Sequence, residues 1–218
     1  SPPPRAYWSP LSLAAEHNLI NRSGYLGFYH DYFREAIRER YLNSDTEQVK
    51  AHLALAEYFE TCESLPRLCE EFPWQLAQGK AWEHLVSQLT QPDLFMTLWD
   101  VNHYDVQEYW VQIEAGSPYT MANTYQSVLD TPDEYDDSYL FRLSSLLAGA
   151  GNLNEASLLR TYLIEYYQGM GDQENLERSL GNHANALYSR GDLDEAMKLR
   201  KEREQICRKL GAKEGLSA

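Results

Sequence analysis

Side chains that could take part in catalysis or metal binding are scattered along this chain and do not form a complete motif. Cys62 and Cys69 lie seven residues apart, but no histidine or second cysteine pair completes a metal-ligand set with them, and Cys207 stands alone. The sequence also lacks a Gly-x-x-x-x-Gly-Lys-Ser/Thr loop for phosphates and a Gly-x-Ser-x-Gly nucleophile turn. We therefore expect neither enzymatic activity nor a bound metal, and we interpret the cysteines as free, buried apolar side chains.

Two asparagines lie on one face of a predicted helix. Asn182 and Asn185 are three residues apart in a stretch with helical periodicity, which puts them on one face of a helix. An amide carries both a donor and an acceptor, so two of them can clamp the backbone of an extended peptide. The alternative is that both amides only meet solvent on an exposed helix face.

Helical periodicity runs through nearly the whole chain, and strand signals are scarce. The exception lies near the start, where apolar residues at 19–20 and 25–29 flank a turn at 21–24 and predict a small β-hairpin. A short helix is expected before it at 11–17, and an amphipathic helix after it at 32–41. The order helix, hairpin, helix is typical of the end of a winged-helix domain.

A series of short helices is expected in the middle of the chain, because proline and glycine repeatedly interrupt the helical pattern there. The predicted helices span residues 46–60, 65–77, 81–90, 92–100, 106–114 and 121–129. The segment is rich in large aromatic residues, which we interpret as its core. The next stretch, 130–137, is acidic and contains proline, and it predicts a domain boundary.

The C-terminal part contains an internal repeat. The segment Gly151-Asn-Leu-Asn-Glu-Ala156 returns as Gly191-Asp-Leu-Asp-Glu-Ala196, an offset of 191 − 151 = 40 residues. In the second copy, helices are predicted at about 174–189 and 193–210, joined by a tight turn. The register continues into Gly211–Leu216, where a third repeat begins and is cut off, so we expect a fragment of a longer protein. Helix pairs of this kind bury little alone and must stack on their neighbours.

Charge and composition restrict the partners of the chain. A formal net charge of −14 argues against binding to nucleic acids or to anionic membranes, because both depend on Lys and Arg side chains. The chain has no apolar run long enough to span a bilayer and no signal peptide, and its three cysteines are too few for a disulfide framework. We therefore expect a cytoplasmic protein.

Residues 180–196, Leu-Gly-Asn-His-Ala-Asn-Ala-Leu-Tyr-Ser-Arg-Gly-Asp-Leu-Asp-Glu-Ala, resemble a tetratricopeptide repeat (TPR). The match is to the longer version found in kinesin light chains and in many bacterial signalling ATPases. In that family the first helices of the stacked repeats line a concave groove that binds peptides or partner domains. The resemblance implies that Asn182 and Asn185 line this groove, together with Arg142 and Ser145, their counterparts one repeat earlier.

A second resemblance involves Phe28-Tyr-His-Asp-Tyr-Phe-Arg-Glu-Ala36, which is similar to the end of the winged-helix domain in signal-transducing STAND ATPases, including the NACHT group. Those proteins carry a Met-His-Asp motif in which the histidine reaches the β-phosphate of ADP and the aspartate supports the turn. Here Tyr29 replaces the Met, while His30 and Asp31 match. The resemblance implies that His30 and Asp31 are nucleotide-sensing residues; the alternative is that His30 only caps its helix.

The connector matches the same class of proteins. The segment Pro66-Arg-Leu-Cys-Glu-Glu-Phe-Pro-Trp-Gln-Leu76, with Gly79 and Trp82-Glu-His-Leu85, resembles the helical segment after the winged helix in NACHT proteins. The predicted fold is therefore all-α with a short β-hairpin wing. Its predicted parts are the end of a winged-helix domain (1–44), a helical connector domain (45–135) and a TPR α-solenoid (136–218) with two complete repeats and a truncated third.

These features lead to one main functional hypothesis and two alternatives. The main one is a non-catalytic regulatory and sensor fragment of a STAND-type signalling NTPase, with a protein or peptide ligand in the TPR groove and a nucleotide-binding domain upstream. No cofactor is expected in this chain, and ADP or ATP would bind the parent protein. The alternatives are a TPR interaction scaffold without an NTPase and a winged-helix transcription regulator with a TPR effector domain, which the scarcity of Lys and Arg before Lys50 disfavours.

Overall fold

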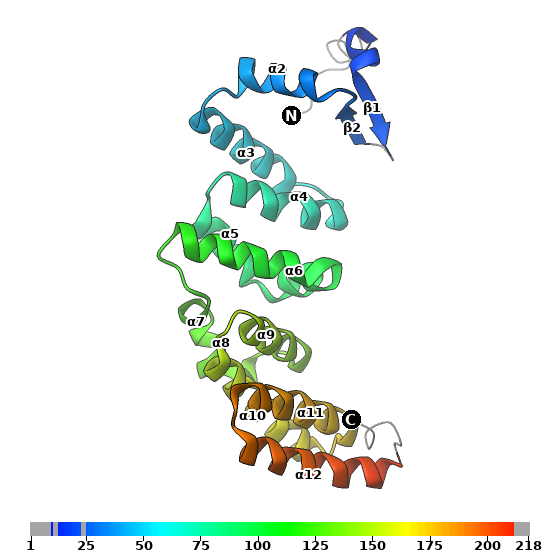
Figure 1. The fold of residues 1–218 in the computed structure, drawn as a ribbon, viewed down its shortest axis with the longest axis vertical. Helices are drawn as coiled ribbons and strands as arrows, with labels where there is room; N and C mark the ends of the chain where they lie inside the picture. Colours follow the sequence, from blue (N-terminus) through cyan, green and yellow to red (C-terminus); the bar gives the residue numbers. More distant parts are fainter. Residues whose placement is uncertain (1–9, 11–12, 23–24, 212–218) are drawn as a thin grey trace. The chain divides into compact units, whose positions relative to one another are not determined.

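The computed structural model describes residue 10 and residues 13–22 and 25–211, which group into two compact units, 1–85 and 86–218. Part of the predicted helix at 11–17, the tip of the predicted turn at 23–24 and the start of the predicted third repeat at 212–216 lie outside the described residues. The described chain is mostly helical with one small hairpin, which confirms the predicted fold class (Figure 1).

The hairpin of the first unit forms where the sequence predicts it. Strand β1 (Leu19–Arg22) pairs antiparallel with β2 (Tyr25–Phe28), with Leu19 opposite Phe28. A 3-10 turn, η1 (Glu16–Asn18), precedes the hairpin, and helix α2 (Asp31–Tyr41) follows it. The rings of Phe28 and Phe33 pack edge to face with centroids 5.6 Å apart, which ties the start of α2 to the hairpin. No residue of α2 is buried.

Helices α3 (Asp45–Glu60) and α4 (Leu65–Gln78) pack against each other and form the core of the first unit. The Ser44 side chain caps α3 by accepting a hydrogen bond from the backbone N–H of Glu47. The core consists of apolar side chains from both helices: Ala56, Phe59, Cys69, Phe72, Leu76 and Ala77. Burial raises the pKa of the Cys69 thiol, with a smaller contribution from the charge of Glu70. Helix α5 (Trp82–Leu89) spans the junction between the units.

The second unit begins with a long bent helix, α6 (Pro92–Gly116). The sequence predicts two helices here, and the structure has one element with a kink at Asn102, whose φ of −162° and ψ of 100° are not helical. The Asn102 side chain accepts a hydrogen bond from the Tyr104 backbone at 3.1 Å and donates one to Asp105 at 2.7 Å. It therefore caps the second segment of α6, which is why the helical pattern breaks at this point.

Short elements connect α6 to the repeat: α7 (Met121–Thr124), α8 (Gln126–Asp130) and η2 (Pro132–Glu134). Tyr125, between α7 and α8, is fully buried, and its hydroxyl donates a hydrogen bond to the backbone oxygen of Leu89 at 3.0 Å. Burial raises the pKa of Tyr125 well above its ordinary value, so its hydroxyl remains a donor. The acidic stretch where the sequence predicts a domain boundary falls inside this unit, and the division into three domains stays a prediction.

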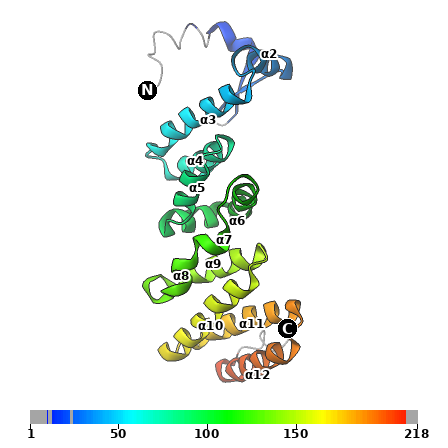
Figure 2. The same cartoon turned by 90° about the vertical axis from the view of Figure 1, so that its left-hand side faces the viewer.

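The repeat forms four helices: α9 (Asp137–Gly149), α10 (Leu153–Met170), α11 (Gln173–Arg190) and α12 (Leu193–Leu210). Each packs against the next in chain order, as Figure 2 shows. Leucines and the small residues predicted to let the helices approach are buried between them: Leu140, Leu143, Leu147, Leu159, Leu163, Leu176, Leu180, Ala184, Leu187 and Ala196. This is the predicted arrangement of stacked helix pairs.

Glycines in the left-handed conformation mark the turns of the repeat. Gly151, Gly171, Gly191 and Gly211 have φ values of 87°, 73°, 94° and 70°, and they lie 20 residues apart, half of the 40-residue repeat. At Gly191 the backbone N–H of Asp192 donates back to the carbonyl of Leu187 at 2.9 Å. This is the bond of a Schellman motif, which ends a helix and turns the chain into the next one.

Candidate binding groove on the helical repeat

A polar hollow of about 280 Å³ lies within the second unit, where the first helices of the repeats, α9 and α11, meet α6. Its lining combines aromatic, cationic and hydroxyl-bearing side chains: Trp99, Asp137, Ser138, Phe141, Arg142, Tyr167, Asn175, Arg178 and Ser179. Every one of these residues except Trp99 and Tyr167 comes from α9 or α11. The hollow therefore lies on the first helices of the repeats, where the sequence analysis expects a groove, and it includes one of the four predicted groove residues, Arg142.

Arg142 is held in place by α6. Its Nη1 donates to the backbone oxygen of Met96 at 3.2 Å and lies 2.7 Å from the carboxylate of Asp100. The side chain is half-buried, so these bonds fix its orientation at the wall of the hollow. Asp100 offsets its charge, and Arg142 is therefore a positioned hydrogen-bond donor more than a free cation.

Arg178 is the free cation of the hollow. It is exposed on α11, and within the described part of the chain its guanidinium makes no hydrogen bond or ion pair. A guanidinium offers five N–H donors in a planar fork that suits carboxylates and phosphates. Arg178 is thus the side chain best placed to bind an anionic group of a ligand.

Two aromatic residues of the hollow, Tyr167 and Trp99, have fixed contacts with neighbouring side chains. Tyr167 is buried, and its hydroxyl donates to the Asp137 carboxylate at 2.7 Å. Burial, together with this bond, holds the pKa of Tyr167 well above its ordinary value. Trp99 packs on the buried ring of Phe95 at a centroid distance of 5.7 Å. These rings offer a fixed apolar surface beside the two arginines.

Asn175 is fixed by the cap of α11. The Asp172 carboxylate accepts from the Asn175 backbone N–H at 3.1 Å and from its side-chain amide at 2.7 Å. These two bonds lower the pKa of Asp172, and Arg178 adds a smaller contribution. Because its amide N–H is bonded to Asp172, Asn175 keeps its amide oxygen as an acceptor for a ligand.

Of the four predicted groove residues, the structure places only Arg142 at the hollow. Ser145 donates its hydroxyl to the Phe141 carbonyl at 3.0 Å, and Asn185 accepts from Arg200 of α12 at 3.3 Å. Asn182 is exposed on α11, outside the lining of the hollow. Whether these amides contact a ligand stays a prediction.

The sequence analysis missed Trp99, Asn175 and Arg178. Arg178 precedes Asn182 by one helical turn, so the spacing that selected the asparagines could also have selected Arg178. Trp99 gave no such signal, because it belongs to α6, which is outside the repeat.

His30 and Asp31 lie together at the start of α2, exposed to solvent. His30 is the N-cap residue through its backbone, and its side chain makes no capping bond. The Tyr29 ring packs edge to face on the imidazole at 4.6 Å, and Asp31 pairs with Arg34 at 3.2 Å. The nucleotide-sensing role of the two residues stays a prediction.

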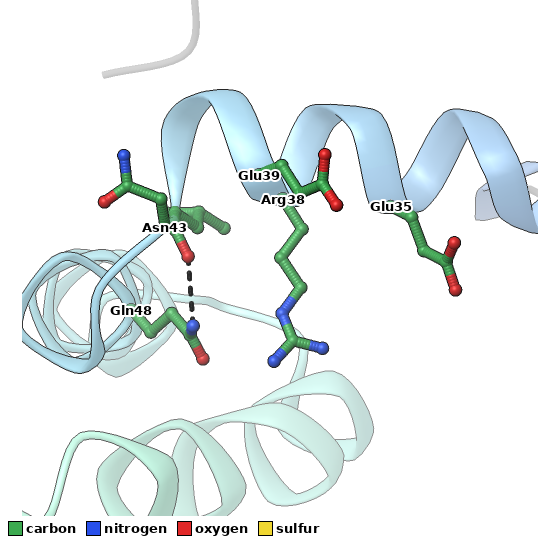
Figure 3. A pocket seen from close by; sticks show the side chains of 6 residues that line it. Glu35, Arg38, Glu39, Asn43 and Gln48 are labelled. Atoms are coloured by element: carbon green, nitrogen blue, oxygen red, sulfur yellow. Dashed lines mark hydrogen bonds between the residues drawn. The ribbon is translucent and has the colours of Figure 1, made fainter.

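A second hollow of about 410 Å³ lies in the first unit, where α2 turns into α3. Its lining is polar and mostly exposed: Glu35, Arg38, Glu39, Leu42, Asn43 and Gln48. Figure 3 shows the Arg38 side chain extending from α2 on the side of Gln48, whose amide donates to the Leu42 carbonyl at 3.0 Å. It has no aromatic wall and no buried side chain, and the groove on the repeat is therefore the better candidate site.

The described residues show neither a metal-binding cluster nor a helix that could span a membrane. No group of three or more His, Cys, Asp or Glu side chains in this part of the chain could hold a metal ion. Among its helices, none is both long and apolar enough to cross a bilayer.

Comparison with known proteins gives one relative. A TPR repeat-containing protein of Dictyostelium discoideum is 26% identical to this chain over an alignment of 192 residues, which covers 79% of the chain. The chain corresponds to 11% of the length of that protein. No protein-family profile and no solved structure matches the chain. The similarity to a TPR protein and the stacked helix pairs both support the TPR interpretation of the repeat.

Proposed function

We propose that this chain is a non-catalytic interaction scaffold that binds a segment of a partner protein in the groove on its helical repeat. The observation that carries the proposal is the hollow between α6, α9 and α11, where a free guanidinium lies beside fixed aromatic rings. The TPR name of the Dictyostelium relative supports the same role. An open, polar hollow with a few fixed donors suits a peptide segment better than a small apolar ligand.

The chemistry of the groove defines the segment that fits it. Arg178 supplies an unpaired positive charge, and Arg142 supplies further N–H donors at a fixed position. The rings of Trp99 and Phe141 supply apolar surface. A segment with a carboxylate next to an aromatic or aliphatic side chain matches this combination.

Selection of random displayed peptides on the purified chain tests this proposal. We expect the selected peptides to combine acidic and apolar residues, and to lose about tenfold or more in affinity when Arg178→Glu reverses the charge of the groove. Lys209→Glu is the matched control, since Lys209 is exposed on α12 and does not line the groove. Fluorescence anisotropy with labelled peptides measures both variants. Equal affinity for the two variants, or no enriched peptide, would contradict the groove proposal.

We further propose that the scaffold is the sensor arm of a STAND-type signalling NTPase. The residues that support this are the His30-Asp31 pair after the hairpin and the connector segment after it. Helix α2 buries none of its residues and exposes Tyr32, so this segment has a surface available for a neighbouring domain. A ligand in the groove would then favour an open state of the parent protein, in which the contact of His30 with nucleotide is broken.

The gene sequence before Ser1 provides the first test of this second proposal. A phosphate-binding Gly-x-x-x-x-Gly-Lys-Ser/Thr loop within a few hundred residues is expected, and its absence would leave the scaffold role without an NTPase. If the loop is present, His30→Ala in the full-length protein should release ADP and raise basal activity. Unchanged ADP retention and unchanged basal activity would exclude the sensor role of His30.

A further inference from the structure

A third and much smaller hollow lies between the helices α10 and α11. It is separate from the groove, and seven residues line it: Leu153, Ser157, Arg160, His183, Ala186, Leu187 and Arg190. Its volume is about 10 Å³, which is enough for one particle of the size of a water molecule. The hollow is therefore large enough for one small group only, such as a water molecule, a small ion or a single carboxylate oxygen.

Two arginines line the hollow, and only one of them has an acidic partner among the described residues. Arg190 pairs with Asp192, but Arg160 makes no hydrogen bond or ion pair with any residue that the structure describes. Arg160 is half-buried, and burial lowers its pKa. A cation that is removed from water without a partner is costly, so the position favours an anion beside Arg160.

His183 faces the same hollow with an unsatisfied nitrogen. Its side chain is only 6% exposed, and its Nδ1 atom is buried without a hydrogen-bond partner. Buried polar atoms in proteins nearly always have a partner, so an occupant of the hollow that His183 lines is the candidate partner for Nδ1. Burial lowers the pKa of His183, and the charge of Arg160 lowers it further, against an opposing effect of Glu195. A neutral imidazole with its proton on Nδ1 can donate to an anion.

The equivalent arginine of the next repeat has side-chain partners. Arg200, the counterpart of Arg160, donates to the Asn185 side chain at 3.3 Å and lies over the Tyr188 ring at 5.1 Å. The counterparts of these two partners one repeat earlier are Ser145 and Ala148. Ser145 uses its hydroxyl on a backbone carbonyl, and Ala148 has no ring. Arg160 therefore lacks both partners that Arg200 has.

We propose that the hollow between α10 and α11 binds one small anion through Arg160, His183 and the hydroxyl of Ser157. A chloride ion and a single carboxylate oxygen share the chemistry that these donors recognise. A bound anion would offset the charge of Arg160, satisfy Nδ1 of His183 and stabilise the packing of α10 on α11, which sets the stacking of one repeat on the next.

Thermal unfolding of the chain in increasing sodium chloride tests the proposal. Salts also act on the whole surface, so the informative quantity is the difference between Arg160→Met and the matched control Arg200→Met. We expect chloride to raise the unfolding temperature of the wild type and of R200M in a saturable way, by about 3–6 °C at ten times its Kd. The saturable shift should be absent in R160M. Equal chloride dependence in R160M and R200M would overturn the proposal and assign the hollow to a water molecule.

A second variant and a second measurement test the proposal independently, in case R160M does not fold. His183→Leu introduces the residue that the preceding repeat has at this position, Leu143, and should also lose the saturable shift. In the wild type, nuclear magnetic resonance should show the pKa of His183 rising on addition of chloride, because a nearby anion favours the charged imidazole. If the pKa of His183 changes neither with sodium chloride nor with sodium acetate, the proposed anion site is contradicted.

Sodium acetate distinguishes the two sources of the anion. A saturable shift with chloride and not with acetate would assign the hollow to a free halide ion. A shift with acetate at lower concentration than with chloride would assign it to a carboxylate, including that of an acidic ligand. Neither result depends on the groove, so failure of the anion site and failure of the proposed function are distinguishable.

Discussion

Helices α2 and α11 are both amphipathic, yet among the described residues only α11 has its apolar face buried by neighbouring helices. Helix α11 buries seven residues between α10 and α12, among them Leu176, Leu180 and Leu187. Helix α2 buries none, and its Tyr32 is 85% exposed. The comparison shows that an amphipathic pattern predicts a helix, whereas its stability comes from whatever covers the apolar face. In the repeat, neighbouring helices cover the apolar face of α11, whereas the described residues leave α2 without a buried side chain.

Removal of an apolar side chain tests this difference most strongly. Leu180→Ala in α11 should lower the free energy of unfolding by about 2–5 kcal/mol, because Leu180 is fully buried and the surrounding helices cannot fill the cavity. Ile37→Ala in α2 is the matched change at a half-buried position and should cost well under half as much. Urea unfolding followed by circular dichroism measures both. Equal losses would show that α2 is packed as tightly as α11.

The ends of the helices provide a second contrast. Gly191 has a φ of 94°, so Gly191→Ala should destabilise the repeat by about 1–2 kcal/mol through strain alone, since nothing lies within 4 Å of the added methyl group. Gly169 also has free space around it but lies inside helix α10, so Gly169→Ala should stabilise the chain by about 0.5–1 kcal/mol.

Thermal unfolding of these two glycine variants should therefore give shifts of opposite sign. Shifts of the same sign would contradict the assignment of the glycines at 151, 171, 191 and 211 as obligatory helix ends.

The cap of α11 should make the repeat sensitive to acid. The pKa of Asp172 is lowered in the folded chain, so the carboxylate stabilises the fold above its ordinary pKa of about 4, and this stabilisation disappears as the pH falls through the lowered value. Asp172→Ala should therefore be less stable than the wild type at pH 7, with a difference that shrinks below pH of about 4. Asp194→Ala, in the first turn of α12, is the control. A difference that does not change between pH 7 and pH 3 would refute the carboxylate cap.

The smallest effect is expected at His30, where α2 begins without a side-chain cap. His30→Ala should change the free energy of unfolding by less than about 0.5 kcal/mol, since the imidazole is exposed and packs edge to face with the Tyr29 ring. Calorimetry of the variant measures the change. A larger loss would favour the alternative that His30 has a structural role in capping its helix.

Local patterns account for the features of the fold that the sequence analysis predicted. Several elements begin and end within one or two residues of the predicted positions. They are the hairpin at 19–28, the helices at 45–60 and 65–78, and both helices of the second repeat. The break at Asn102 also falls between two predicted helices. Polar caps, glycine turns and apolar periodicity act over a few residues, so they can be recognised without knowledge of the rest of the chain.

The candidate site was predicted less well, because it depends on residues that are distant in the sequence. Arg142 was selected through the repeat register, but its partners Met96 and Asp100 belong to α6, more than 40 residues earlier. The register also selected Asn185, whose amide is used by Arg200 within the repeat itself. A repeat pattern shows which positions are equivalent, and it does not show which of them lie free in the groove.

The sequence by itself determined that this chain is a helical repeat preceded by a hairpin and shorter helices, because a 40-residue period, glycines recurring at the turns and helical periodicity of apolar residues allow few other folds. It also indicated a binding function without a catalytic motif. Only the tertiary structure decided that Arg178 makes no ion pair with a described residue although it lines the same hollow as Trp99, and that Arg160 and His183 line one small hollow between two helices. These properties depend on how side chains from different helices pack against one another, and no local pattern encodes that packing.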